Sequence, residues 1–259
     1  MSDSIITKVA RFGNDSSKCH CLWRANVPNT HLAGLEKILR LLQSLCMITA
    51  AYLLQSSPSG AAPFQQGIKS LAVGRRYLRF FKLFPLLDTF WTVSEKGSAK
   101  GRNQIVHLLE MGKVGFGALY LIGQNVTMLD AMGVWKVEWA GMVMMEANRF
   151  WFYSLACACM LTLHGLWNLP SFPAPVEVEK GDSFEERTKA GLEKRKAVEL
   201  AAKNGERRKR LVKDLVMYGA DLFIPGDLTG WMRTEQWWVG SAMAVSTLLA
   251  SEEVWEKVN

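Results

Sequence analysis

The sequence predicts an all-α fold, namely a helical membrane protein with amphipathic interfacial helices and one or two membrane-embedded helices. Three observations support this prediction. Apolar residues recur at helical spacing over most of the chain, without a convincing run of the two-residue alternation typical of strands. Several of the ten Trp residues stand at the edges of apolar runs, where an indole ring suits a membrane interface. Residues 71–87 also separate basic from aromatic side chains around one helix.

The charge of the chain is unevenly distributed. Of its 259 residues 49% are hydrophobic and 21% are charged, values that an ordinary globular protein also shows. Charge is concentrated between residues 170 and 213, whereas long stretches elsewhere carry almost none. The net charge of +7 favours an anionic partner, either lipid or nucleic acid. Because the apolar stretches favour a membrane, we expect anionic membrane lipid as the partner and no nucleic acid.

Glycine, proline and serine clusters divide the chain. We expect breaks at residues 56–63, 94–101, 170–175 and 225–226. Five segments follow from these breaks: a polar N-terminal tail (1–29), an amphipathic helical region (30–92), central apolar helices (93–169), a charged connector (170–210) and a C-terminal apolar helical region (211–259). The tail has no apolar core of signal-peptide length, so we expect no secretory signal.

The first helix is expected to run from Thr30, which can cap it, to Gln55. Polar side chains fall on one of its faces, at Glu36, Lys37, Arg40, Gln43 and Ser44, and apolar ones fall on the other, at Leu35, Ile38, Leu42 and Leu45. Beyond Leu45 the helix is apolar all round. That uncharged part is shorter than the roughly 20 residues that cross a bilayer, so a buried or interfacial helix is predicted.

Residues 71–87 are the most informative segment. At 3.6 residues per turn, four cations fall within about 120° of arc, namely Arg75, Arg76, Arg79 and Lys82. Apolar side chains cluster opposite them, namely Val73, Tyr77, Phe80, Phe81, Phe84 and Leu87. We expect the cations to bind anionic lipid headgroups and the apolar side chains to insert beside the acyl chains.

The alternative for residues 71–87 is a helix that packs on the protein core and leaves its basic face in water. The segment contains no Asp or Glu. Solvated faces normally mix charges of both signs, so a polar arc of one sign favours lipid.

Residues 114–135 form a second apolar region with the length of a membrane span. The region contains Gln124, Asn125 and Asp130, and an ionised Asp130 at mid-depth would cost several kcal/mol. A helix buried against other helices, or lying in the interface, therefore fits as well as a span.

Residues 150–169 are the best spanning candidate, because they carry no formal charge and have Trp near both ends. His164 within them is expected to be neutral and hydrogen-bonded to a backbone carbonyl rather than a ligand. Residues 236–250 are short for a span, but their small side chains would let another helix approach closely.

The connector is expected to contain a solvated helix over residues 184–210, with Glu and Lys at helical spacing. The basic cluster at residues 207–210 could contact phosphate, although a solvated flank is the commoner explanation. An amphipathic helix over residues 211–224 is expected to end at Pro225.

Motifs for catalysis are missing from the sequence. We find no phosphate-binding loop, dinucleotide-binding pattern, nucleophile elbow or His-Glu-x-x-His zinc motif. We therefore predict that the protein is not an enzyme, with no catalytic residues, no metal site and no cofactor.

Four motifs together resemble a known family. Residues 34–43 are similar to the pattern Gly-x-Asp-Lys-x-x-Arg-x-x-Gln through Gly34, Lys37, Arg40 and Gln43, with Glu36 in place of Asp. The other three are the basic helix at 75–82, a central Tyr…Asp-Asn motif matched by Tyr120, Gln124 and Asn125, and a C-terminal signature matched by residues 221–225, Gly240, Ser246 and Trp255. In this order the chain resembles the peroxin-11 family, in one of its divergent fungal branches.

The resemblance implies a peroxisomal membrane protein that remodels and elongates the membrane in peroxisome proliferation and fission. It also implies a homo-oligomer that works with dynamin-related division machinery. Two alternatives stay open. Gln124, Asn125, Asp130 and His164 within apolar stretches would suit a metabolite channel or transporter subunit. Residues 176–213 would suit an adaptor that recruits division factors.

Overall fold

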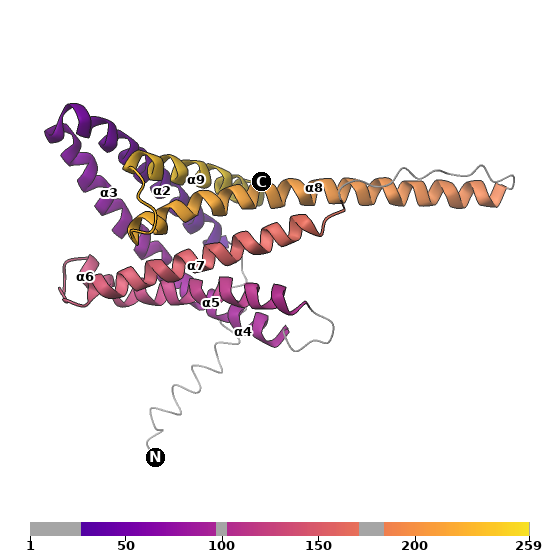
Figure 1. Ribbon diagram of the computed structural model, residues 1–259, viewed down its shortest axis with the longest axis horizontal. Coiled ribbons are helices and arrows are strands. Elements are labelled where there is room, and N and C mark those ends of the chain that lie inside the picture. The colour runs from indigo at the N-terminus through magenta and orange to yellow at the C-terminus, as the bar shows by residue number, and fades with distance from the viewer. Residues whose placement is uncertain (1–26, 97–102, 171–183, 259) are drawn as a thin grey trace, which may run out of the picture.

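A computed structural model describes residues 27–96, 103–170 and 184–258. Within these ranges the chain forms helices and no strand, which confirms the all-α prediction (Figure 1). The elements are α2 (Val27–Ser56), α3 (Pro58–Arg79), the 3-10 helix η1 (Phe80–Lys82), α4 (Leu83–Lys96), α5 (Gln104–Val126), α6 (Met128–Ala131), α7 (Ala140–Trp167), α8 (Phe184–Leu228) and α9 (Gln236–Val258). Most of the predicted N-terminal tail, and most of the breaks at 94–101 and 170–175, lie outside the described residues.

The helices form two packed groups. Helix α2 packs against α3 and α9, while α5 packs against α7 and α4. Helix α8 contacts both α7 and α9 and so joins the groups. Figure 1 shows the N-terminal part of α8 projecting beyond the bundle as a rod.

Side-chain caps and small residues explain where helices begin and how they approach. The Ser57 hydroxyl accepts a hydrogen bond from the Gly60 backbone N–H at 3.3 Å, and α3 begins with Pro58 directly after it. Gly240 lets α9 approach α2, since a Cβ there would lie 3.2 Å from the Ser44 carbonyl oxygen. The small residues of 236–250 were predicted to allow close approach of another helix. At Gly240 that helix is α2 of the same chain.

Three predictions about where helices are continuous or broken are wrong. The helix expected over residues 71–87 is interrupted by η1, and the helix expected to end before Pro225 continues to Leu228. Pro63, expected in a break, lies inside α3. A proline at this position removes one N–H, which leaves the carbonyl of Ser59 in the first turn without that donor. Because Ser59 is exposed, water can replace the lost bond.

The bundle turns polar side chains inward and large apolar side chains outward. Its buried polar residues are Glu36, Arg40, Gln43, Ser44, Arg75, Gln124, Thr127, Asn148, Thr162, Ser246 and Thr247. On α2 the predicted apolar face of Leu35, Ile38, Leu42 and Leu45 is exposed. In water so large an apolar surface would be costly, whereas hydrocarbon solvates it well. The outer surface therefore fits a membrane.

Among the residues that the structure describes, three helical segments are long and apolar enough to cross a membrane by length and composition: Gly34–Ser56, Gln104–Val126 and Ala140–Trp167. The membrane fold is thus confirmed, with three qualifying segments instead of one or two. The uncharged part of the first helix had been expected to be too short for a span. Its charged groups at Glu36 and Arg40 turn into the bundle, so the exposed residues from Gly34 to Leu54 are all apolar. Residues 150–169, predicted as the best spanning candidate, belong mostly to the second half of α7, which is the third of these segments.

Residues 114–135 do not form one helix. Helix α5 ends at Val126, and Asp130 lies beyond it in the short helix α6. An Asp130 carboxylate oxygen accepts a hydrogen bond from the Val137 backbone N–H at 3.1 Å. Asp130 is therefore outside the candidate spans, and the cost of an ionised carboxylate at mid-depth does not arise.

Candidate functional site

The outward side of α3, η1 and α4 is aromatic. The exposed rings Tyr77, Phe80, Phe81 and Phe84 form what we call the aromatic face. Phe81 and Phe84 are each 59% exposed, and Phe80 meets Phe81 edge to face at 5.3 Å between ring centroids. Val73 and Leu87, also predicted to insert into lipid, are half-buried.

Arg75 points away from the aromatic face, into the bundle. Its side chain is 6% exposed, and its Nη1 donates a hydrogen bond to Gln43 Oε1 on α2 at 2.7 Å. Burial, followed by the neighbouring charges of Arg79 and Arg40, lowers the pKa of Arg75 to about 9, so the guanidinium stays protonated at neutral pH. The sequence placed Arg75 among the headgroup contacts, but the structure places it between helices because α2 and α9 cover this side of α3.

Arg79 and Lys82 meet the carboxylate of Glu36 on α2. Arg79 Nε lies 3.6 Å from Glu36 Oε1, and Lys82 Nζ pairs with Glu36 Oε2. Arg79 Nη1 also donates to the Tyr120 hydroxyl oxygen on α5 at 3.0 Å, which accepts a second bond from Gln124 Nε2 at 2.7 Å. The counter-charge missing from residues 71–87 is therefore supplied by another helix.

Headgroup binding by the four cations stays a prediction. The positions of Lys82 and Arg76 suit such binding better than those of Arg75 and Arg79. The Lys82 side chain is 44% exposed, and Arg76 is half-buried. Both could still reach a phosphate beside the aromatic face. Arg75 and Arg79 instead fit a role in holding α3 to the bundle.

Arg40 joins α2 to the C-terminal helices. Its guanidinium pairs with Asp221 on α8 and donates a hydrogen bond to the Ser246 hydroxyl oxygen on α9 at 2.9 Å. We use the name polar network for three groups of bonded side chains: Glu36, Arg79, Lys82, Tyr120 and Gln124; Gln43 and Arg75; and Arg40, Asp221 and Ser246. The polar network connects helices that are far apart in the sequence.

The residues of the family-like motifs occupy different places. Arg40, Gln43 and Gln124 belong to the polar network. Asn125 lies beside it and donates a hydrogen bond to the Phe80 carbonyl oxygen at 3.2 Å, which holds η1 against α5. Gly34 has open space around it and Lys37 is half-buried, so neither has an evident part in these contacts.

Four members of the polar network were not predicted as site residues: Glu36, Tyr120, Asp221 and Ser246. Each belongs to one of the four motifs noted in the sequence. Their presence in motifs was the available signal, but no local spacing shows that they meet across separate helices.

The polar groups that suggested a channel in the sequence each bond to a different neighbour in the structure. Gln124 bonds to Tyr120, and Asn125 bonds to the backbone of η1. His164 was expected to bond to a backbone carbonyl, but its ring nitrogen Nε2 lies 3.1 Å from the Asn168 side-chain amide. These groups do not gather along one path, so the geometry gives the channel alternative no particular support.

The inverted distribution of polar and apolar groups, together with the three candidate spans, defines a helical membrane protein. Residues 29–255 match the family model described as Peroxisomal biogenesis factor 11 (PEX11). The chain therefore belongs to the PEX11 family and is a peroxisomal membrane protein, in a family associated with peroxisome proliferation. This is a family of biogenesis factors and not of enzymes.

The comparison identifies the family and not a branch within it, so the fungal branch stays a prediction. Comparisons with curated proteins and with solved structures return no match.

Proposed function

We propose that the protein elongates the peroxisomal membrane by inserting its aromatic face into one leaflet. The supporting observation is that Phe81 and Phe84 point away from the protein while cations of the same segment are tied to the bundle. Aromatic side chains inserted beside the acyl chains widen one leaflet, which favours positive curvature.

The polar network gives this wedge an anchor. Glu36, on the candidate span Gly34–Ser56, contacts Arg79 and Lys82, which flank the exposed rings of Phe80 and Phe81. An amphipathic helix on a flexible linker could leave the bilayer by itself. Here the wedge is packed on a membrane-embedded helix, so its depth is set by the whole bundle.

Anionic lipid is the proposed partner of this surface. Lys82 lies at the edge of the aromatic face and keeps part of its side chain accessible. A phosphate beside Lys82 would add a charge-assisted contact to the burial of the rings.

Membrane tubulation tests the wedge. The full chain is reconstituted into anionic liposomes as wild type, as the Phe81→Ser/Phe84→Ser variant and as a control, Val212→Ser/Val216→Ser, which changes exposed apolar residues on α8. We expect tubules counted by electron microscopy to fall severalfold in the phenylalanine variant and to stay near wild type in the control. Equal tubulation by the phenylalanine variant would overturn the proposal.

We also propose that copies of the protein self-associate and so concentrate the wedges on one patch of membrane. The family resemblance supports this step, and no surface is assigned to it here. Two differently tagged full-length chains, co-expressed and solubilised, should co-purify. Failure to co-purify after crosslinking in the intact membrane would argue against self-association.

The projecting part of α8 supports the adaptor as a second role. Its described residues 195–205 are mostly exposed and extend away from the packed helices (Figure 1). We propose that this rod binds dynamin-related division machinery. Deleting residues 195–205 should weaken binding of a purified dynamin-related GTPase, and unchanged binding would refute the role.

A further inference from the structure

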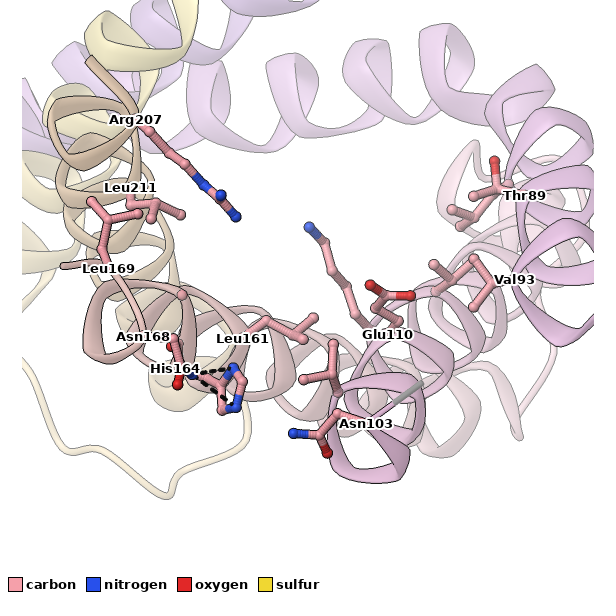
Figure 2. A pocket seen from close by; sticks show the side chains of 15 residues that line it. Thr89, Val93, Asn103, Glu110, Leu161, His164, Asn168, Leu169, Arg207 and Leu211 are labelled. Carbon is pink, nitrogen blue, oxygen red and sulfur yellow. Dashed lines mark hydrogen bonds between the residues drawn. The ribbon is translucent and has the colours of Figure 1, made fainter. Parts of the chain in front are cut away.

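A cavity of about 820 Å³ lies between α4, α5, α7 and α8, away from the aromatic face (Figure 2). Its lining is largely apolar and includes Val93, Val106 and Leu161. This volume is within the usual range for sites that bind small molecules or cofactors.

Two cations from different helices enter this apolar lining. Arg207 of α8 points into the cavity in Figure 2, and Lys113 of α5 also lines it. Lys113 Nζ lies 3.2 Å from the Tyr218 hydroxyl oxygen and 5.0 Å from the centre of that ring. Glu110 lines the same cavity and has an interaction of its own. The formal charge of these three groups is +1, which suits an anion.

The position of the cavity along the candidate spans points to lipid. Asn103, directly before α5, and Asn168, directly after α7, both line it, so it reaches the level where α5 begins and α7 ends. Lys113 lies nine residues into α5, which is about 14 Å along the helix at 1.5 Å per residue. A cation at such depth is unfavourable without a counter-charge, and charged groups inside membrane segments commonly mark functional sites.

We propose that this cavity binds one phospholipid with an anionic headgroup. The phosphate lies between Lys113 and Arg207, and an acyl chain packs along the side of Leu161. A guanidinium binds carboxylate and phosphate alike in a bidentate manner. The second cation, Lys113, favours phosphate, because a phosphate has more oxygens than a carboxylate and can contact both cations at once. The site is separate from the aromatic face, so it does not depend on the proposed wedge.

Lipid retention tests the proposal on the full chain in detergent. The protein is incubated with equal amounts of phosphatidic acid, phosphatidylcholine and oleate, and bound species are measured by native mass spectrometry. We expect one retained phosphatidic acid. In Lys113→Gln/Arg207→Gln retention should fall about tenfold or more, because two charge-assisted contacts are lost. The control Arg208→Gln/Lys209→Gln changes neighbouring exposed cations that do not line the cavity and should retain wild-type binding.

A second pair of variants tests the location without changing charge. Leu161→Trp fills the cavity, whereas Leu163→Trp adds the same ring to the outward side of α7, where Leu163 is exposed. Only Leu161→Trp should lose phosphatidic acid. Unchanged retention in Leu161→Trp or in Lys113→Gln/Arg207→Gln would overturn the site. Equal retention of phosphatidylcholine or oleate would overturn the anionic phosphate as its ligand.

Discussion

At the scale of single residues, Glu36 balances charge for more than one helix. It is a buried carboxylate of α2, and its oxygens face Arg79 at the end of α3 and Lys82 in η1. Losing one partner of a buried pair leaves the others without a counter-charge.

Replacing Glu36 with Gln should therefore destabilise the fold. Breaking a buried ion pair costs roughly 3–5 kcal/mol, and the partial exposure of Lys82 puts the expected loss at the lower end. Thermal unfolding of the purified chain in detergent would show a lower Tm. The matched control is Glu199→Gln, which removes an exposed pair with Lys203 on α8 and should have little effect. Equal Tm shifts for the two variants would contradict a structural role of Glu36.

At the scale of elements, close packing of α5 on α7 depends on a glycine. Gly123 is buried, and a Cβ at this position would lie 2.6 Å from the Cβ of Ala147, which is itself buried. Side chains of this region form an apolar core in which Tyr120 stacks on Trp151 at 4.9 Å between ring centroids. The two helices cannot accept a methyl group here without moving apart.

Gly123→Ala should thus lower stability, although alanine is the better helix former. Overpacking of a close contact typically costs about 1–3 kcal/mol. Gly219→Ala on α8 is the control, because a Cβ there meets nothing within 4 Å and should stabilise the helix slightly. Thermal unfolding in detergent distinguishes the two variants, because Tm should fall in Gly123→Ala and rise slightly in Gly219→Ala. A Gly123→Ala variant as stable as wild type would mean that α5 and α7 pack less closely than the structure shows.

At the scale of the whole molecule, the surface of the bundle is suited to hydrocarbon. Between Gly34 and Leu54 the exposed residues of α2 are apolar, and its buried residues include the charged Glu36 and Arg40. A protein in water shows the opposite distribution. We infer that lipid covers the outer face of α2, although the protein itself leaves that face open.

Cysteine labelling in intact membranes tests whether lipid covers the outer face of α2. In a chain whose native cysteines are replaced by serine, Ile38→Cys should resist a membrane-impermeant maleimide, even though Ile38 is 58% exposed in the structure. Glu199→Cys on the projecting part of α8 should react readily. Detergent should make the cysteine at position 38 more reactive. Rapid labelling of this cysteine in the membrane would show that water, and not lipid, meets this face.

The sequence by itself determined the helices, the separation of basic from aromatic residues over 71–87 and the order of motifs that marks the family. Each of these features depends on residues within a few helical turns of each other. The periodicity of the sequence indicates such local features directly. One interruption that it missed, at η1, is held by Asn125 from a distant helix.

Only the tertiary structure decided which face of each amphipathic helix turns outward, because the periodicity of an amphipathic helix is the same in water and in lipid. It brought Glu36 to Lys82, 46 residues away, and Arg40 to Asp221, 181 residues away. Charges that had no counter-charge in their own segment found one across helices. For this physical reason Arg75 and Arg79, two of the four cations predicted for lipid headgroups, contact the bundle. Lys82 also pairs with Glu36 but keeps 44% of its side chain exposed.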